Sequence, residues 1–147
     1  MRDPNLEFIM LVARLQRENQ EIIKARLENE QIRDLNPAQA IILMNIRQKE
    51  TSVGSLIERG YYAGSNVSYN VKKMLERGYV EQRVSESDRR SLLVRPSEKG
   101  MKICDLLARA LSGASDYEIL AKNLESSLRE ALEELEKIKI DWRKTGS

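Results

Sequence analysis

The sequence predicts a mainly α-helical chain that carries one small β-hairpin. Apolar residues recur at helical spacing over most of its length, whereas short β-favouring segments follow each other only between residues 79 and 95. A hydrophobic content of 41% in 147 residues supports one domain-sized core with helical extensions.

The first helix is expected to begin at Asp3 and Pro4, which suit an N-cap and the first helical position. No glycine or other proline follows before about Asp34, so we expect one long helix. A helix of this length cannot pack fully on one small core, which predicts that its apolar residues form a subunit interface. The alternative is a helix packed only on its own domain.

Two shorter helices are expected next. Asn36 and Gln39 form a capping box around Pro37, which predicts the start of a buried second helix. The pair Thr51-Ser52 is expected to cap a short third helix over residues 53–59.

The stretch 65–78 predicts a helix that follows a glycine-containing turn. Its apolar residues follow one helical stripe, at Val67, Val71, Met74 and Leu75. Ser65 is expected as its N-cap, and Gly78 as its end. Two helices joined by such a turn predict a helix-turn-helix. In the turn, Tyr61 and Tyr62 either pack at the joint or line an effector pocket.

The other face of this helix carries donor-rich side chains, and these are Asn66, Ser68, Tyr69, Asn70, Lys72 and Lys73. Side chains of these kinds contact DNA phosphates and base edges, so we predict a DNA recognition helix. Ordinary solvated lysines are the alternative interpretation of Lys72 and Lys73.

A hairpin is expected directly afterwards, with strands over 79–84 and 91–95 and a polar tip over 85–90. A helix-turn-helix followed by such a hairpin is a winged helix. The tip carries Asp88, Arg89 and Arg90, and an arginine-tipped hairpin fits the narrow minor groove of DNA. The alternative is a simple surface ion pair between the arginines and Asp88.

Two further helices are expected at the end of the chain, the first starting at Ser97 and interrupted at Gly113. The second carries an apolar stripe, formed by Leu120, Leu124, Leu128, Leu132, Leu135, Ile138 and Trp142. This spacing is typical of an amphipathic helix that packs against a partner.

Charge and composition narrow the function. Residues 65–102 hold 9 Lys and Arg against 5 Asp and Glu, which suits a polyanion-binding centre. The chain has no histidine, which removes the commonest general base and metal ligand, and a single cysteine excludes an internal disulfide. We therefore expect no enzyme, metal or cofactor. Cys104 is expected to be a buried small hydrophobe rather than a redox sensor. No apolar run is long enough to span a membrane, so we expect a cytoplasmic protein.

The run from Leu56 to Lys102 resembles the MarR family of bacterial winged-helix regulators, most strongly in three segments: 76–81, 88–94 and 97–100. Residues 60–62 and 64–70 resemble its LdtR-type subgroup, linked to cell-wall transpeptidase control. The resemblance implies a homodimer in which the first and last two helices of each chain intertwine. It also implies binding to double-stranded DNA at a pseudo-palindrome, and release of DNA by a small aromatic or amphipathic ligand.

The resemblance implies residue roles by position. Arg90 matches the wing arginine that enters the minor groove, Asp88 the acid that orients it, and Arg89 a phosphate contact. On the helix, we expect Asn66, Tyr69 and Asn70 to contact base edges. We expect Ser65, Lys72 and Lys73 to contact phosphates, and Ser68 to face the groove. The chain departs from the family where Tyr61-Tyr62-Ala63 replaces the usual Gly-Leu-Ser turn, and its first helix lacks the cysteine of the peroxide sensors.

These observations predict a DNA-binding winged helix-turn-helix over 37–96, and a helical dimerisation domain formed by 1–36 and 97–147. The expected function is a homodimeric, ligand-responsive transcriptional repressor that binds a pseudo-palindromic operator. The alternative is a winged-helix protein-interaction module without DNA binding.

Overall fold

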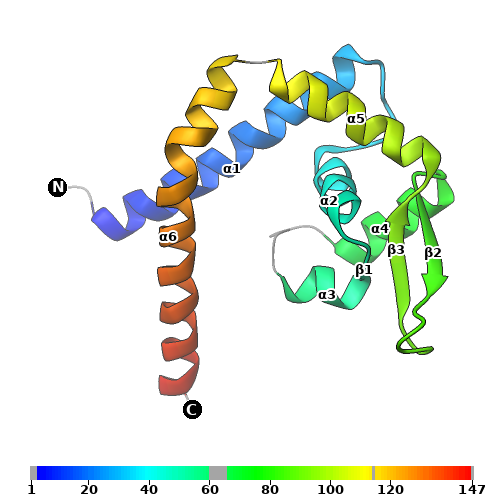
Figure 1. Cartoon of the computed structure of the whole chain (residues 1–147). Helices are drawn as coiled ribbons and strands as arrows, with labels where there is room; N and C mark the ends of the chain where they lie inside the picture. Colours follow the sequence, from blue (N-terminus) through cyan, green and yellow to red (C-terminus); the bar gives the residue numbers. More distant parts are fainter. Residues whose placement is uncertain (1–2, 60–65, 114, 147) are drawn as a thin grey trace. The chain divides into compact units, whose positions relative to one another are not determined.

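Helices account for most of the fold, and a three-stranded sheet forms its β part (Figure 1). The computed structural model describes residues 3–59, 66–113 and 115–146. The chain divides into two units, Met1–Leu107 and Ala108–Ser147. The mainly helical fold with a small β-hairpin is therefore confirmed.

Helix α1, Pro4–Asn29, begins as predicted, because the Asp3 carboxylate accepts the Asn5 backbone N–H at 2.9 Å. The expected end near Asp34 is wrong. Gln31 adopts a left-handed φ of 59°, and the Ile32 N–H then bonds the Leu27 carbonyl at 2.9 Å. This pairing ends a helix and normally uses glycine at the left-handed position.

Helix α2, Pro37–Gln48, starts at the predicted capping box. The Gln39 N–H donates to the Asn36 side chain at 2.8 Å, and the Asn36 N–H donates to the Gln39 side chain at 3.1 Å. Helix α3, Val53–Glu58, is capped by the Ser52 hydroxyl, which accepts the Ser55 N–H at 3.1 Å. Gly60 and the turn 61–64 lie outside the described residues.

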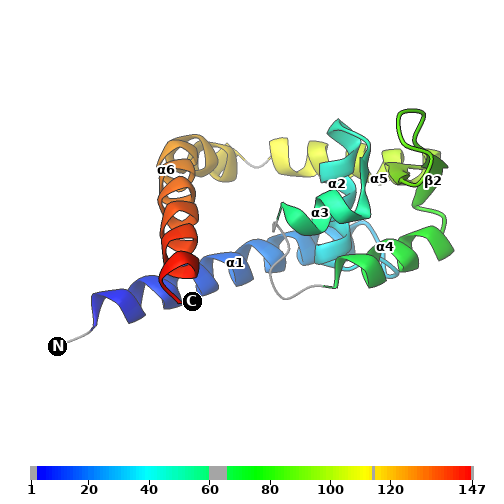
Figure 2. The ribbon, with the colours of Figure 1, turned by 90° about the horizontal axis from the view of Figure 1, so that it is seen from below.

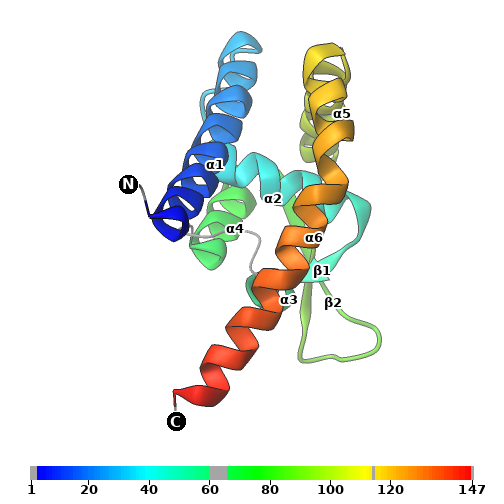
Figure 3. The ribbon, with the colours of Figure 1, turned by 90° about the vertical axis from the view of Figure 1, so that its left-hand side faces the viewer.

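Three antiparallel strands form one sheet in the order β1-β3-β2. Strand β2, Val80–Val84, pairs with β3, Leu92–Pro96, so the predicted hairpin is confirmed. Strand β1, Thr51–Ser52, was not predicted, and pairs Thr51 with Val94. Figures 1 and 3 both show the β2–β3 hairpin projecting from the helices of the first unit.

The core lies in the first unit, under α2, α3, α4 (Val67–Glu76) and the sheet, which Figure 2 shows grouped together. Its buried apolar residues come from all of these elements, from the end of α1 and from α5, Glu98–Ser112. Cys104 is fully buried, as predicted, with its Sγ 3.7 Å from the Leu43 carbonyl oxygen. Burial raises the pKa of this thiol and so disfavours the reactive thiolate.

Helix α6, Ser115–Thr145, leaves the predicted apolar stripe exposed in this single chain. The apolar residues in the first half of α1 are exposed as well, among them Ile9 and Met10. Within the described residues, no helix is both long enough and apolar enough to cross a membrane.

A tight joint connects the end of α4, the start of β2 and the start of α5. Gly78, with φ +76°, ends α4. The Tyr79 carbonyl oxygen that follows accepts the Ser97 N–H at 3.0 Å, while the Ser97 hydroxyl donates to the Gly78 carbonyl at 2.5 Å. A Cβ at Gly100 would lie 2.0 Å from the Tyr79 oxygen, so only glycine fits there.

Gly100→Ala should therefore destabilise the protein by about 1 to 3 kcal/mol, the usual cost of overpacking. Gly54→Ala is the matched control, since a Cβ there would meet nothing closer than the Ser52 hydroxyl at 3.9 Å. Urea unfolding followed by circular dichroism measures both. Equal midpoints for the two variants would contradict the close approach.

Candidate nucleic-acid interface

Helix α4 begins one residue later than predicted. Its N-cap is Asn66, whose side-chain oxygen accepts the Tyr69 N–H at 2.9 Å, and not Ser65, which itself lies outside the described residues. Asn and Ser are equally good caps, so the sequence did not distinguish them. The Asn66 oxygen is thus used within the helix, and its amide N–H groups remain to donate to a ligand.

One face of α4 presents polar side chains to solvent. Asn66, Ser68, Tyr69 and Lys72 are exposed, and Lys73 is half-buried. The Lys73 ammonium lies 3.1 Å from the Glu76 carboxylate and 5.7 Å from the centre of the Tyr69 ring. Both contacts hold Lys73 along the helix, so the exposed part of this face is formed by Asn66, Ser68, Tyr69 and Lys72.

Asn70 does not belong to this face, which corrects the prediction that it contacts base edges. It is only 6% exposed, and its side-chain oxygen accepts a hydrogen bond from the Gln39 amide at 3.1 Å. The reason is the helical period, because position 70 lies three residues after Val67 and four before Met74, on the buried stripe.

The wing tip is shaped by Asp88. One carboxylate oxygen accepts the Arg90 backbone N–H at 3.0 Å, and the other accepts the Ser91 hydroxyl at 2.9 Å. These bonds hold the pKa of Asp88 below its usual value, and the bond from the Arg90 backbone contributes more than the bond from Ser91. The acid therefore acts on the backbone of Arg90 and not on its guanidinium.

Arg89 and Arg90 are both exposed at this tip. Across the parts of the chain that the structure describes, no ion pair or hydrogen bond engages either guanidinium group. The surface ion pair considered as an alternative is thus not formed, and two cations remain available to an anionic partner.

The wing is supported by two ion pairs, neither of which was predicted from the sequence. Arg83 on β2 donates two bonds to Glu50, the first from Nε at 2.7 Å, and the bond lowers the pKa of Glu50. Arg95 on β3 lies 3.2 Å from Glu81 across the hairpin. The Arg95 pair follows from the strand register, whereas Arg83 and Glu50 are far apart in sequence and no local pattern predicts their contact.

A second missed cluster surrounds Tyr79. Its hydroxyl donates to the Asp34 carboxylate at 2.6 Å, and the Lys99 ammonium lies 4.1 Å from the centre of its ring. Burial of the phenol raises the pKa of Tyr79 to about 12, and the hydrogen bond to Asp34 is the second cause of this increase. The phenol is therefore neutral and serves as a fixed donor at any physiological pH.

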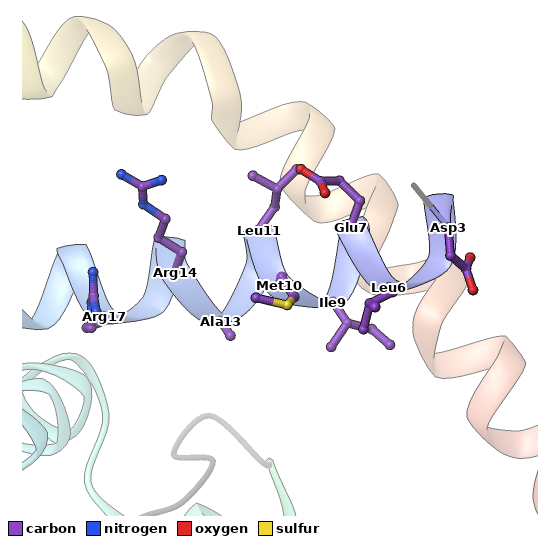
Figure 4. Close-up of a pocket in the computed structure, with 9 residues that line it drawn as sticks. All are labelled: Asp3, Leu6, Glu7, Ile9, Met10, Leu11, Ala13, Arg14 and Arg17. Atoms are coloured by element: carbon purple, nitrogen blue, oxygen red, sulfur yellow. The ribbon is translucent and has the colours of Figure 1, made fainter. Parts of the chain in front are cut away.

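The first half of α1 borders an open hollow, lined by Asp3, Leu6, Glu7, Ile9, Met10, Leu11, Ala13, Arg14 and Arg17. Figure 4 shows Leu6 and Ile9 pointing to one side of the helix and Leu11 and Arg14 to another, so apolar surface surrounds much of this segment. Among the described side chains, no cluster of three or more acidic or cysteine groups could hold a metal ion.

Comparison with known proteins agrees with this geometry. A model of the MarR family matches residues 33–91. The exopolysaccharide II synthesis transcriptional activator ExpG of Rhizobium meliloti (strain 1021) is 32% identical over 136 residues, which cover 92% of this chain and 70% of ExpG. The chain belongs to the MarR family. It is thus a MarR-family transcriptional regulator with a DNA-binding winged helix. The narrower LdtR-type assignment stays a prediction.

Solved structures share the fold of this MarR-family chain. The regulator BldR from Sulfolobus solfataricus has a TM-score of 0.61 at 22% identity, with 88% of this chain and 99% of BldR covered. FabT from Streptococcus pneumoniae, solved in complex with DNA, has a TM-score of 0.68 at 17% identity, with 89% of this chain and 99% of FabT covered.

The bonds of Asp88 predict a pH-dependent wing tip. Because its pKa is lowered in the folded state, the stabilisation is complete above the ordinary aspartate pKa of 3.8 and is lost as the pH falls through the lowered value. The Arg90 and Ser91 amide resonances should therefore shift with a midpoint below pH 3.8 in an NMR titration.

Asp88→Ala should abolish this step. A step that persists in the variant would assign it to another carboxyl group, of which Glu86 at the same tip is the nearest in sequence.

Proposed function

We propose that this MarR-family protein is a homodimeric, sequence-specific repressor that binds a pseudo-palindromic operator and responds to a small ligand. The observation that carries the proposal is the wing tip, where Arg89 and Arg90 are exposed with unengaged guanidinium groups. Such cations suit the narrow minor groove, while the exposed face of α4 suits the adjacent major groove.

The exposed surfaces also support separate regions for DNA binding and for dimerisation. Residues 37–96 act as the DNA-binding domain, and 1–36 with 97–147 act as the dimerisation domain. The exposed apolar faces of α1 and α6 support this assignment, since exposed apolar surface of this extent marks a protein interface. A two-fold dimer would hold two α4 helices at the spacing of successive major grooves, about 34 to 36 Å.

In this proposal the base edges are contacted by Asn66 and Tyr69, and the phosphates by Ser65, Lys72, Lys73 and Arg89. Ser68 lies at the groove surface and Arg90 enters the minor groove. Asn70 is left out because its side chain is buried.

The response to a small aromatic or amphipathic ligand rests on the family resemblance. Benzoate, as a probe, should lower the affinity for a preferred duplex in a fluorescence anisotropy titration. If neither benzoate nor larger aromatic acids change that affinity, the ligand response is wrong.

Activation of transcription is a second candidate, favoured by the name of ExpG, which is a transcriptional activator. A reporter gene behind the preferred site distinguishes the two, because its expression should fall with a repressor and rise with an activator.

The alternative of a protein-interaction module without DNA binding is tested by measuring the affinity for DNA at increasing salt concentrations. A specific regulator should lose affinity steeply as salt rises and keep its preference for one site.

Arg90→Ala should weaken binding to the preferred site by about 1 to 3 kcal/mol, because it removes one specific contact. The dimer and the unfolding temperature should not change. Lys102→Ala, which removes a charge on α5 paired with Glu98, is the control and should bind as wild type. Wild-type affinity in Arg90→Ala would remove Arg90 from the interface.

Leu128→Lys should dissociate the dimer. Leu128 is 50% exposed in the single chain, and a charge placed in an apolar interface should raise the dimer dissociation constant at least about tenfold. Sedimentation measures this, with Ser126→Lys as the control, because Ser126 is exposed and lies on the opposite side of the same helix. A dimer of unchanged affinity would show that this face of α6 lies outside the interface.

A further inference from the structure

One short segment, which runs from the connection after α1 into the first turn of α2, contacts the first half of α4 and the residues just after its end. The segment is Asp34–Gln39, and its polar side chains reach residues near positions 70 and 79. The inference drawn from it rests on the proposed function, in which α4 contacts base edges.

The first half of α4 is held through Gln39. Its side-chain oxygen accepts the Asn36 N–H at 3.1 Å, and its amide donates to the Asn70 oxygen at 3.1 Å. Gln39 is 2% exposed and Asn70 is 6% exposed. The bond is therefore shielded from water, and Gln39 cannot touch DNA.

The far end of α4 is held through Asp34. The Arg77 guanidinium donates to its backbone carbonyl, and the Tyr79 hydroxyl donates to its carboxylate at 2.6 Å. Lys99 donates to the Arg77 carbonyl at 2.9 Å and so closes the cluster. Tyr79 is 3% exposed, so it too is out of reach of DNA.

The remaining contacts of α4 with the core are apolar, made by Val67, Val71, Met74 and the partly buried Leu75. Apolar contacts are not directional, so alone they define the rotation of a helix poorly. A buried hydrogen bond has a narrow range of distance and angle, and at low dielectric it is costly to break. Recognition of base edges needs such accuracy, because it depends on paired hydrogen bonds.

We propose that Gln39 and Tyr79 are positioning residues that fix the orientation of α4 for base recognition, although neither touches DNA. Loss of either bond should reduce the preference for the correct site. Non-specific affinity should be unchanged, because it depends on phosphate contacts that tolerate small shifts of the helix.

The experiment uses the chain of 147 residues. Wild type first selects its preferred duplex from a random library, and the affinities for that duplex and a scrambled one are then measured with the unfolding temperature. The variants are Gln39→Met, Gln39→Met combined with Asn70→Leu, and Tyr79→Phe. The control is Gln48→Met, at the exposed end of the same helix α2.

Gln39→Met should lower both the unfolding temperature and the ratio of the two affinities, the ratio by about tenfold, which is the cost of one specific contact. The combined variant should regain part of the stability, because Asn70→Leu removes the buried amide that Gln39→Met leaves without a partner. The capping-box bond from the Asn36 N–H stays lost in both variants, and Asn36 is exposed to water. The ratio of the combined variant should stay low, since the directional bond is still absent. Tyr79→Phe should also lower the ratio of the two affinities, because it removes the bond at the far end of α4. Gln48→Met should have the ratio and the unfolding temperature of wild type.

Recovery of the ratio together with the stability would show that the Gln39 bond is merely structural, and would overturn the proposal for that end. If Gln39→Met does not fold, Tyr79→Phe decides alone, and a wild-type ratio in that variant overturns the proposal. A wild type that selects no duplex overturns the proposed function itself, and this inference with it.

Discussion

The contact between Gly100 and the carbonyl oxygen of Tyr79 is the constraint on which the winged helix depends. At this point α4 has just ended, β2 begins, and the first turn of α5 packs against both. The same oxygen accepts the Ser97 N–H, so the start of α5 is bonded to the strand that leads into the wing. The end of the recognition helix and the start of the wing are therefore both packed against the start of α5 at one backbone joint.

This joint also explains why the three segments that resemble the MarR family stand where they do. Residues 76–81 form the end of α4 and the start of β2, and residues 97–100 form the turn that packs on them. The third segment, 88–94, supplies the wing tip and most of β3. Two of the three motifs are thus architectural, and only the wing tip offers unengaged charge to a ligand.

The sequence predicted elements wherever a local signal marks them. Asp3, the Asn36–Gln39 capping box and Gly78 each act within a few residues, and each is found in its expected role. The end of α1 was missed because Gln31 takes the left-handed position that glycine usually occupies. Strand β1 was missed because two residues show no periodicity and form a strand only by pairing with β3. Asn70 was misassigned by residue type, although its position on the apolar stripe was already visible. The contacts of Glu50 with Arg83 and of Asp34 with Tyr79 connect distant parts of the chain, and only the folded structure brings them together.

The burial of Cys104 has a practical consequence for measuring this protein. It is the chain's one cysteine, and its thiol is shielded inside the core. A second cysteine placed at the wing tip would therefore be the site modified by a thiol-directed spin label, without removal of the native residue. In a two-fold assembly each label would have one symmetry mate, so a single distance distribution would report how far apart the two wings stand, and how that separation changes when DNA or a small molecule is added.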